Sequence, residues 1–226
     1  MGIRFSIIKE GRLLVEIISH RGNLDGTDKS ENTTESFEKC FSRGFGIETD
    51  VRDYSGKLVL SHDIGSIDSP EVNELFYILR KYPKQYIALN IKADGIGVLL
   101  RDLLNHNKIS NYFAFDMSIP QMLEYRNMGI KYLTRQSELE KSPVLYEDAA
   151  GVWLDAFQDD SWIDENTIKN HLMNGKKVCI VSPELHKRRF LEFWYRIKSY
   201  KTNDIMICTD YPIKANDLFN TVENEL

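Results

Sequence analysis

Short apolar runs rich in β-branched residues alternate with longer segments of helical periodicity along the sequence, and this alternation most constrains the fold. Such alternation is typical of βαβ units, which build a parallel sheet. We expect strands at residues 14–19, 46–51, 57–61, 86–91, 112–115, 130–134, 151–154, 177–181 and 205–209. We expect helices at residues 33–43, 70–81, 97–105, 120–128, 165–174, 184–198 and 215–224, while residues 136–149 give no clear pattern.

The second and third of these strands are joined by the turn Tyr54-Ser55-Gly56, which predicts a short hairpin. Counted as one unit, the hairpin leaves eight strand positions, each followed by a helix. This pattern predicts an α/β fold, a TIM (β/α)8 barrel with a short hairpin extension after the second strand. The 226 residues fit a single domain of this kind spanning residues 1–226. A doubly wound open sheet is the alternative, but no glycine-rich dinucleotide-binding loop supports it.

Composition excludes several classes of protein. The formal net charge of −5 offers no general electrostatic surface for nucleic acid. No run approaches the roughly 18 apolar residues of a transmembrane segment, and charged residues interrupt the first 20 residues, so we expect no signal peptide. The three cysteines are scattered singly, which indicates reduced thiols in a cytoplasmic protein.

Ionisable residues follow the apolar runs at the ends of several expected strands. In a TIM barrel the carboxyl ends of the strands form the active-site face, so these side chains should meet there. They are His20-Arg21-Gly22, Glu48-Thr49-Asp50, His62-Asp63, Asn90-Ile91-Lys92 and Thr209-Asp210.

Glu48 and Asp50 are spaced i, i+2 on one expected strand, so their carboxylates point to the same side. Two carboxylates in one small space repel each other unless a cation or a proton joins them. Oxygen ligands favour Mg²⁺ or Ca²⁺ over zinc. The alternative is an ordinary salt bridge with Arg52 or Lys57.

Two histidines and two cations flank this pair in the sequence. His20 and His62 are suited to proton exchange near neutral pH. Arg21 and Lys92 supply positive charge for phosphate oxygens. Together with a divalent metal, these groups describe a site for phosphoryl chemistry.

Three other histidines are given different places. His106 and His171 fall within or at the ends of expected helices, and we expect both to face solvent. His186 follows the strand at 177–181 and could reach the mouth of the barrel.

Asn32 precedes Thr33, Thr34 and Glu35 in the pattern of a helix N-cap with an acidic residue at the third position. We interpret Asn32 as the cap. A second role, in which Asn32 bonds a site residue, is not required by the pattern.

Taken in order, the sequence resembles the glycerophosphodiester phosphodiesterase family. The resemblance implies a TIM barrel and a phosphoric diester hydrolase of lipid metabolism with a small phosphodiester substrate. It implies that His20 and His62 are the general acid–base pair, that Glu48 and Asp50 bind the divalent metal, and that Arg21 and Lys92 bind phosphate. The wider superfamily includes spider-venom-type sphingomyelinases and bacterial phosphatidylinositol-specific phospholipases. The matching stretches are His20-Arg21-Gly22, Glu31-Asn32-Thr33 with Ser36-Phe37, Glu48-Thr49-Asp50-Val51, Leu58-Val59-Leu60-Ser61-His62-Asp63, Asn90-Ile91-Lys92 and Thr209-Asp210-Tyr211-Pro212.

The sequence departs from the family pattern in two places. The family's third metal ligand is usually a glutamate two residues before the lysine, and Asn90 stands there. An amide oxygen can coordinate Mg²⁺ or Ca²⁺ with less charge, and Asp94 or Asp155 are alternative ligands. The family's insertion after the His-Asp pair is reduced to residues 64–84, which leaves the alcohol groups of the substrate open.

The sequence therefore predicts a metal-assisted phosphodiesterase that cleaves a glycerophosphodiester-type substrate, with water or a neighbouring substrate hydroxyl as the attacking group. Asp155, Trp153 and His186 are candidate substrate-binding residues. One alternative is a catalytically decayed barrel that acts as a binding or regulatory protein. Another is a phosphodiesterase of phosphodiester-linked glycans with an aromatic mouth formed by Trp153, Phe157 and Trp162, although core packing is the simpler role for these rings.

Overall fold

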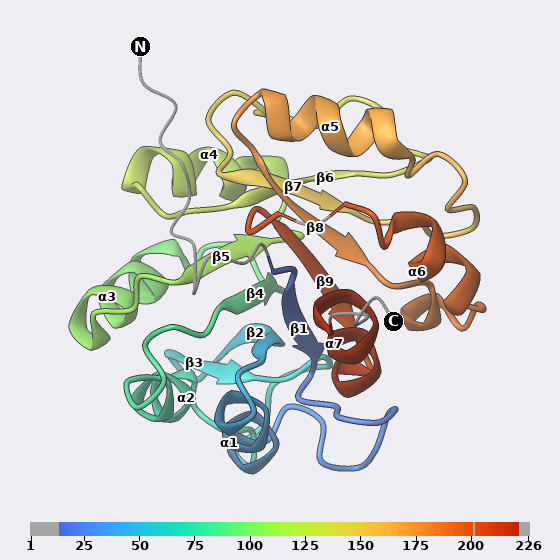
Figure 1. Ribbon diagram of the computed structural model, residues 1–226. Coiled ribbons are helices and arrows are strands. Elements are labelled where there is room, and N and C mark those ends of the chain that lie inside the picture. Colours follow the sequence, from blue (N-terminus) through green and yellow to red (C-terminus); the bar gives the residue numbers. More distant parts are fainter. Residues whose placement is uncertain (1–13, 201, 222–226) are drawn as a thin grey trace.

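The computed structural model describes residues 14–200 and 202–221 and has the architecture of a TIM barrel (Figure 1). Eight parallel strands lie in the order β5-β4-β2-β1-β9-β8-β7-β6. They are β1 (Glu16–His20), β2 (Gly46–Tyr54), β4 (Ile87–Ile91), β5 (Tyr112–Phe115), β6 (Leu133–Gln136), β7 (Gly151–Leu154), β8 (Lys177–Val181) and β9 (Ile205–Thr209). The fold class expected from the alternating pattern is therefore confirmed.

One further strand lies outside this order, and one pair of neighbouring strands in the barrel is joined by few hydrogen bonds. Strand β3 (Lys57–Leu60) pairs antiparallel with β2, with Val51 opposite Leu60. The first and last strands of the order, β5 and β6, are joined by a single bridge between Ala114 and Tyr132. The Ala114 amide donates to the carbonyl of Lys131 at 2.9 Å, so the barrel is nearly closed.

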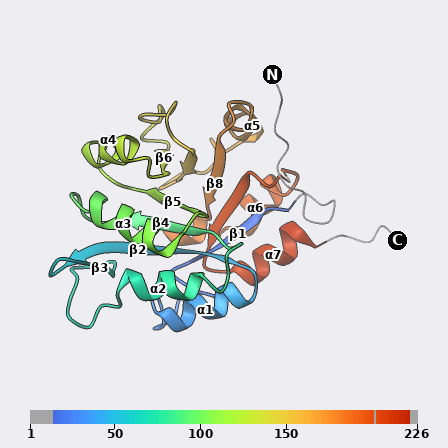
Figure 2. The same cartoon turned by 90° about the vertical axis from the view of Figure 1, so that its left-hand side faces the viewer.

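Helices cover the outside of the barrel (Figures 1 and 2). No helix among the described residues is long and apolar enough to span a bilayer. The helices are α1 (Thr34–Ser42), α2 (Val72–Leu79), α3 (Gly97–Asn107), α4 (Ile119–Met128), α5 (Glu165–Met173), α6 (Leu191–Ile197) and α7 (Pro212–Asn220), with a 3₁₀ turn η1 (Pro183–His186) before α6.

Two expectations about helices are wrong. The connection between β6 and β7, residues 137–150, contains turns and no helix, so one strand lacks its helix. The helix expected at residues 184–198 is divided into η1 and α6, because Lys187 takes a left-handed conformation with φ 60° that ends the first turn. The expected helix at 215–224 begins earlier, at Pro212, and its last three residues lie outside the described part.

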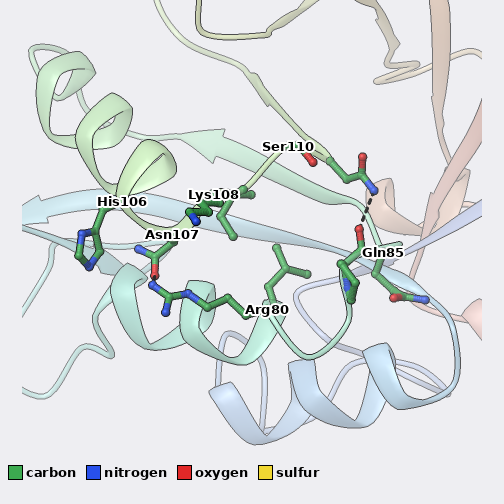
Figure 3. Close-up of a pocket in the computed structure, with 10 residues that line it drawn as sticks. Arg80, Gln85, His106, Asn107, Lys108 and Ser110 are labelled. Atoms are coloured by element: carbon green, nitrogen blue, oxygen red, sulfur yellow. Dashed lines mark hydrogen bonds between the residues drawn. The ribbon is translucent and has the colours of Figure 1, made fainter.

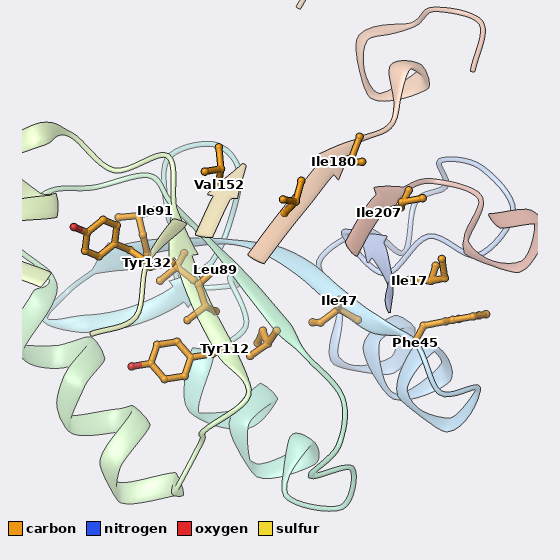
Figure 4. Close-up of a cluster of buried hydrophobic side chains, with 14 of the residues drawn as sticks. Ile17, Phe45, Ile47, Leu89, Ile91, Tyr112, Tyr132, Val152, Ile180 and Ile207 are labelled. Atoms are coloured by element: carbon orange, nitrogen blue, oxygen red, sulfur yellow. The ribbon is translucent and has the colours of Figure 1, made fainter. Parts of the chain in front are cut away.

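The barrel separates two apolar clusters. The larger cluster lies between the strands and the helices and includes Ile17, Ile47, Leu89 and Ile207, which point outward from the barrel (Figure 4). The smaller cluster comes from the alternate strand positions and fills the barrel interior; it comprises Ile18, Ala88, Phe113, Phe115, Leu133, Trp153, Cys179, Val181, Met206 and Cys208. Because side chains alternate along a strand, the next inward positions toward the carboxyl ends stand above this apolar plug.

Two observations concern the remaining histidines and cysteines. Cys40, Cys179 and Cys208 are buried and free, as expected. His106 is exposed, but the expectation that His171 faces solvent is wrong. His171 is buried and lies 2.7 Å from Gln136 Oε1 and 2.9 Å from the Tyr146 hydroxyl, so its two polar contacts replace the lost water.

Gly151 at the start of β7 gives a test of how tightly the barrel interior is packed. A Cβ atom there would clash with the backbone carbonyl oxygen of Lys177 and lie 2.8 Å from Leu133 Cδ2. We expect Gly151→Ala to destabilise the protein by about 1–3 kcal/mol, because strand backbones cannot separate without losing hydrogen bonds. Gly97→Ala is the matched control, since its nearest neighbours are the side-chain ends of Glu124 and Gln121, at 3.0 and 3.1 Å, and not backbone atoms. Equal unfolding midpoints in urea for the two variants would contradict this account.

Candidate active site

A pocket of about 190 Å³ opens at the carboxyl ends of the barrel strands, directly above the apolar plug. Its lining comes from the ends of six strands and the turns that follow them. The lining residues are His20, Glu48, Asn90, Phe115, Asp116, Trp153, Asp155, Phe157, Val181, Leu185 and His186. Several predicted site residues therefore meet in one place.

A second hollow, of about 330 Å³, lies at the opposite end of the barrel between the ends of α2 and α3 (Figure 3). Arg80 there donates a hydrogen bond to Asn107, and His106 and Lys108 stand beside them. None of the predicted site residues lines this hollow, so its larger volume does not make it the candidate active site.

Glu48 and Asp50 project from β2 into the top of the barrel, as their spacing predicts. Both are buried, with exposed fractions of 2% and 0%. The sheet register places Glu48 beside His20 on β1 and Asp50 beside Asn90 on β4. Glu48 thus lines the pocket between a histidine and an amide, and Asp50 is buried one inward position further along β2.

Asp50 is held by two cations and one amide. Arg21 Nε lies 3.0 Å from Asp50 Oδ2, and Lys92 Nζ lies 3.3 Å from Oδ1. The alternative partners proposed from the sequence are engaged elsewhere, since Arg52 donates to the carbonyl of His62 and Lys57 pairs with Glu71. The pair of carboxylates is therefore not an ordinary surface salt bridge.

Asn32 has a different role from the expected helix cap. The cap of α1 is Thr33, whose hydroxyl accepts from the Ser36 amide at 3.2 Å. Asn32 stands one residue earlier in a left-handed conformation with φ 57°. Its Nδ2 donates to Asp50 Oδ2 at 3.1 Å, and its Oδ1 accepts from the Thr49 hydroxyl at 2.7 Å. The capping interpretation is therefore wrong, and Asn32 bonds a site residue instead.

His20 is oriented by Asp210 at the end of β9. Its Nδ1 lies 2.7 Å from Asp210 Oδ1, and because a carboxylate only accepts, Nδ1 carries the proton. The same Asp210 oxygen accepts from Asn23 Nδ2 at 2.8 Å. The other ring nitrogen, Nε2, faces Glu48 Oε2 at 3.9 Å. Burial alone would lower the pKa of His20, but the hydrogen bond to Asp210 and the charges of Glu48 and Asp210 outweigh it and raise the pKa.

The positive charges around Glu48 do not fully compensate the burial of its carboxylate. Burial, followed by repulsion from Asp50, raises the pKa of Glu48 to about 7 despite the opposing charges of His20, Arg21 and Lys92. A carboxyl in this position requires either a proton or a cation near neutral pH.

The donor atoms around these carboxylates fit a hard divalent cation. Asn90 Oδ1 is buried and has no hydrogen-bond partner among the described residues. Asp50 Oδ1 accepts no hydrogen bond either, and its charge is opposed by Lys92 Nζ at 3.3 Å. Two carboxylates and an unpartnered amide oxygen form an all-oxygen set of the kind that Mg²⁺ and Ca²⁺ accept. The described residues contain no cluster of three or more His, Cys, Asp or Glu side chains suited to a metal, so Asn90 would have to complete the protein's share.

His62 lies on the exposed segment that follows β3. Its side chain is 51% exposed, and its Nδ1 lies 3.0 Å from Asp63 Oδ1. It does not line the pocket that contains His20 and Glu48. The structure therefore does not place the two histidines of the sequence pattern around one cavity.

The other side of the pocket contains the candidate substrate-binding residues. Asp155 at the end of β7 accepts from His186 Nε2 at 2.6 Å. Trp153 is buried and stacks on Phe115 with ring centres 3.8 Å apart, which makes these rings the floor of the pocket. Phe157 meets the edge of His186 at 5.2 Å. Trp162 packs against the outer apolar cluster, and Asp94 accepts from the Ser118 hydroxyl, so neither reaches the pocket.

Sequence reasoning missed several polar residues that support the site. Asp210 was recognised as a strand end, but its bond to His20 was not, although it shares strand parity with Cys208 inside the barrel. Asp116, which forms an ion pair with Arg135 at 2.8 Å, lies just after β5 and has no distinguishing neighbours in the sequence. Burial raises the pKa of Asp116, against the opposing effect of Arg135.

Comparison with known proteins supports the architecture. No protein-family model matches the sequence, and no curated protein matches it. The structure is similar to that of a glycerophosphodiester phosphodiesterase from Parabacteroides distasonis, with a TM-score of 0.69, 15% identity, and coverage of 92% of this chain and 98% of that one. It is equally similar to a glycerophosphodiester phosphodiesterase from Agrobacterium tumefaciens, with a TM-score of 0.68, 16% identity, and coverage of 91% and 97%. The chain thus shares the TIM-barrel fold of these two phosphodiesterases over nearly its whole length.

Proposed function

We propose that this protein is a metal-assisted phosphodiesterase that cleaves a small glycerophosphodiester-type substrate in the pocket above β1, β2 and β4. The observation that carries the proposal is the convergence of a carboxylate-oriented histidine, His20, with the buried pair Glu48 and Asp50 and the cations Arg21 and Lys92. The shared fold with two glycerophosphodiester phosphodiesterases supports it. The buried, free cysteines support a reducing compartment such as the cytoplasm.

In the proposed mechanism His20 handles the proton of the attacking hydroxyl. Asp210 fixes the Nδ1 proton, so Nε2 is the basic nitrogen, and it points toward Glu48 in the pocket. Arg21 and Lys92 hold non-bridging phosphodiester oxygens and oppose the negative charge that grows in the transition state. The attacking hydroxyl belongs to water, or to the substrate itself if a cyclic phosphate forms first. His62 remains, from the sequence pattern, the predicted second acid–base residue.

Glu48, Asp50 and Asn90 would hold a divalent cation, Mg²⁺ or Ca²⁺. Such an ion supplies Lewis-acid polarisation of a phosphodiester oxygen. The protein's own contribution is to keep these three oxygen donors dry and fixed on neighbouring strands, so little reorganisation is required when a substrate arrives.

The competing function is a binding or regulatory protein built on a catalytically decayed barrel. Two observations favour it: Asp50 is already neutralised by Arg21 and Lys92, and His62 does not line the pocket. A glycan phosphodiesterase has less support, because Trp162 packs against the outer cluster and Trp153 forms the floor.

We expect His20→Gln to lower turnover of a phosphodiester by about 10²–10⁴-fold, because Nε2 can no longer accept a proton. Asp210→Asn should also lower turnover, since it removes the carboxylate that orients the His20 ring. His106→Gln, on the exposed face of α3, is the control and should leave turnover unchanged. Rates are measured on glycerophosphodiesters and bis(p-nitrophenyl) phosphate with added Mg²⁺ or Ca²⁺. A wild-type protein that cleaves no phosphodiester in this panel would favour the binding function.

Removal of the cation with EDTA should abolish activity, and added Mg²⁺ or Ca²⁺ should restore it. If Asn90 is the third protein ligand, Asn90→Asp or Asn90→Glu adds a charged donor and should tighten cation binding on the order of tenfold. Calorimetry, or a cation-dependent rise in melting temperature, measures this directly. Should Asp94→Asn or Asp155→Asn abolish cation binding while both Asn90 variants leave it unchanged, the assignment of Asn90 is wrong.

The raised pKa of Glu48 predicts how stability changes with pH. A carboxyl whose pKa is higher in the folded state than in the unfolded state stabilises the fold only while it is protonated, so this contribution falls as pH rises from about 4.5 to about 7. In cation-free buffer, the free energy of unfolding of Glu48→Gln should therefore rise relative to that of the wild type by up to about 3 kcal/mol as pH increases over this range. The exposed Glu147→Gln is the control. A difference between Glu48→Gln and wild type that stays constant with pH in urea unfolding would refute this coupling.

A further inference from the structure

A second histidine–carboxylate pair faces the pocket from the side opposite the metal-type carboxylates. His186 Nε2 lies 2.6 Å from Asp155 Oδ1, and both residues line the same cavity as His20. Because a carboxylate only accepts a hydrogen bond, Nε2 carries the proton. The other ring nitrogen, Nδ1, has no hydrogen-bond partner among residues 14–200 and 202–221 and remains free to act on a ligand.

The surroundings of His186 fix its position. It ends the short turn η1, which follows β8, and Asp155 directly follows β7, so the pair connects the carboxyl ends of two neighbouring strands. The Phe157 ring packs against one edge of the imidazole. Asp155 is buried, with an exposed fraction of 6%, whereas the His186 side chain is 25% exposed and therefore accessible from the pocket.

The same turn also supports the first pair. The Glu184 carboxylate, two residues before His186, accepts from the Asp210 amide at 3.2 Å and from the Thr209 hydroxyl. Since Asp210 orients His20, the two histidines are connected by the His20–Asp210 and Asp210–Glu184 hydrogen bonds and by the backbone of η1. Their relative placement is thus determined by packed structure and not by a free loop.

His62 offers no comparable arrangement, because its contact is with the exposed Asp63 and it does not line the cavity. We propose that His186, positioned by Asp155, is the second acid–base group of the phosphodiester cleavage in this chain, in place of His62. This inference rests on the proposed phosphodiesterase function.

The step is balanced as an ordinary displacement at phosphorus. Water gives a proton to His20 Nε2 while its oxygen forms a bond to phosphorus. His186 enters the step with a proton on each ring nitrogen. The bond between phosphorus and the leaving alkoxy oxygen breaks, and the proton on His186 Nδ1 passes to that oxygen to give the free alcohol and a neutral imidazole. Asp155 keeps its hydrogen bond to Nε2 throughout and opposes the positive charge of the doubly protonated ring. Exchange with water then returns each histidine to its starting state.

A comparison of two leaving groups tests this role. An alkyl alcohol needs a proton to depart, whereas p-nitrophenolate leaves readily without one. We therefore expect His186→Gln to lower kcat on a glycerophosphodiester such as glycerophosphocholine by about 10²–10⁴-fold. The same variant should lose less than about tenfold on bis(p-nitrophenyl) phosphate, while His20→Gln loses activity on both substrates. A purely structural role would affect both substrates alike.

Further variants separate the possible outcomes. Asp155→Asn keeps the shape of the positioning residue. Its kcat should show the same dependence on the leaving group, with a smaller decrease than that of His186→Gln. His106→Gln is the remote control, and melting temperatures identify any variant that fails to fold. If His62→Ala shows the leaving-group dependence and His186→Gln does not, the proposal for His186 is overturned and the phosphodiesterase function stands. If the wild type cleaves neither substrate, the proposed function fails, and the role of His186 fails with it.

Discussion

Two buried carboxylates on one strand are the constraint around which the rest of this site is arranged. Removing an ion from water costs several kcal/mol even after the protein relaxes, so Asp50 requires compensation at close range. Arg21, Lys92 and Asn32 provide it. Arg21 and Asn32 both adopt left-handed backbone conformations, with φ 50° and 57°, and each such residue costs about 1–3 kcal/mol. The backbone N–H of Asn32 donates a hydrogen bond of 2.9 Å to the backbone carbonyl of Arg21, which links these two strained positions.

The apolar floor of the pocket strengthens the interactions between these charges. Phe115 and Trp153 stack across the barrel interior and exclude water from below. Charges above such a floor interact more strongly than they would in bulk solvent. The barrel is therefore a packed body, and the polar side chains of its pocket lie in a layer at the rim that begins with His20, Glu48 and Asn90.

Sequence reasoning predicted the parts of the structure that depend on local periodicity. The strands at 112–115, 151–154, 177–181 and 205–209 have the predicted bounds, because each is a short run of buried residues, apart from Lys177 at the start of β8. The inward direction of Glu48 and Asp50 followed from strand parity alone. One strand is displaced, since the run expected at residues 130–134 lies at Leu133–Gln136, and the other errors concern loops. Whether Asn32 or Thr33 caps α1 and whether residues 137–150 form a helix both depend on the path of the chain between elements, which no periodic pattern specifies. His171 was misplaced for a related reason, since the Tyr146 side chain that contacts it comes from that same irregular segment, and its other partner, Gln136, ends β6.

The single bridge between β5 and β6 has a consequence for how the barrel moves. Every other pair of neighbouring strands in the ring is joined by a ladder of three or more residue pairs, whereas Ala114 and Tyr132 meet once and an Arg135–Asp116 ion pair spans the rim above them. Local opening of a protein follows its least supported contacts. Amide protons along this junction should therefore exchange with solvent before those of β1, β8 and β9. The barrel behaves in this respect as a curved sheet whose two edges, β5 and β6, are weakly joined. This junction lies next to the part of the cavity that Asp116 and Asp155 line.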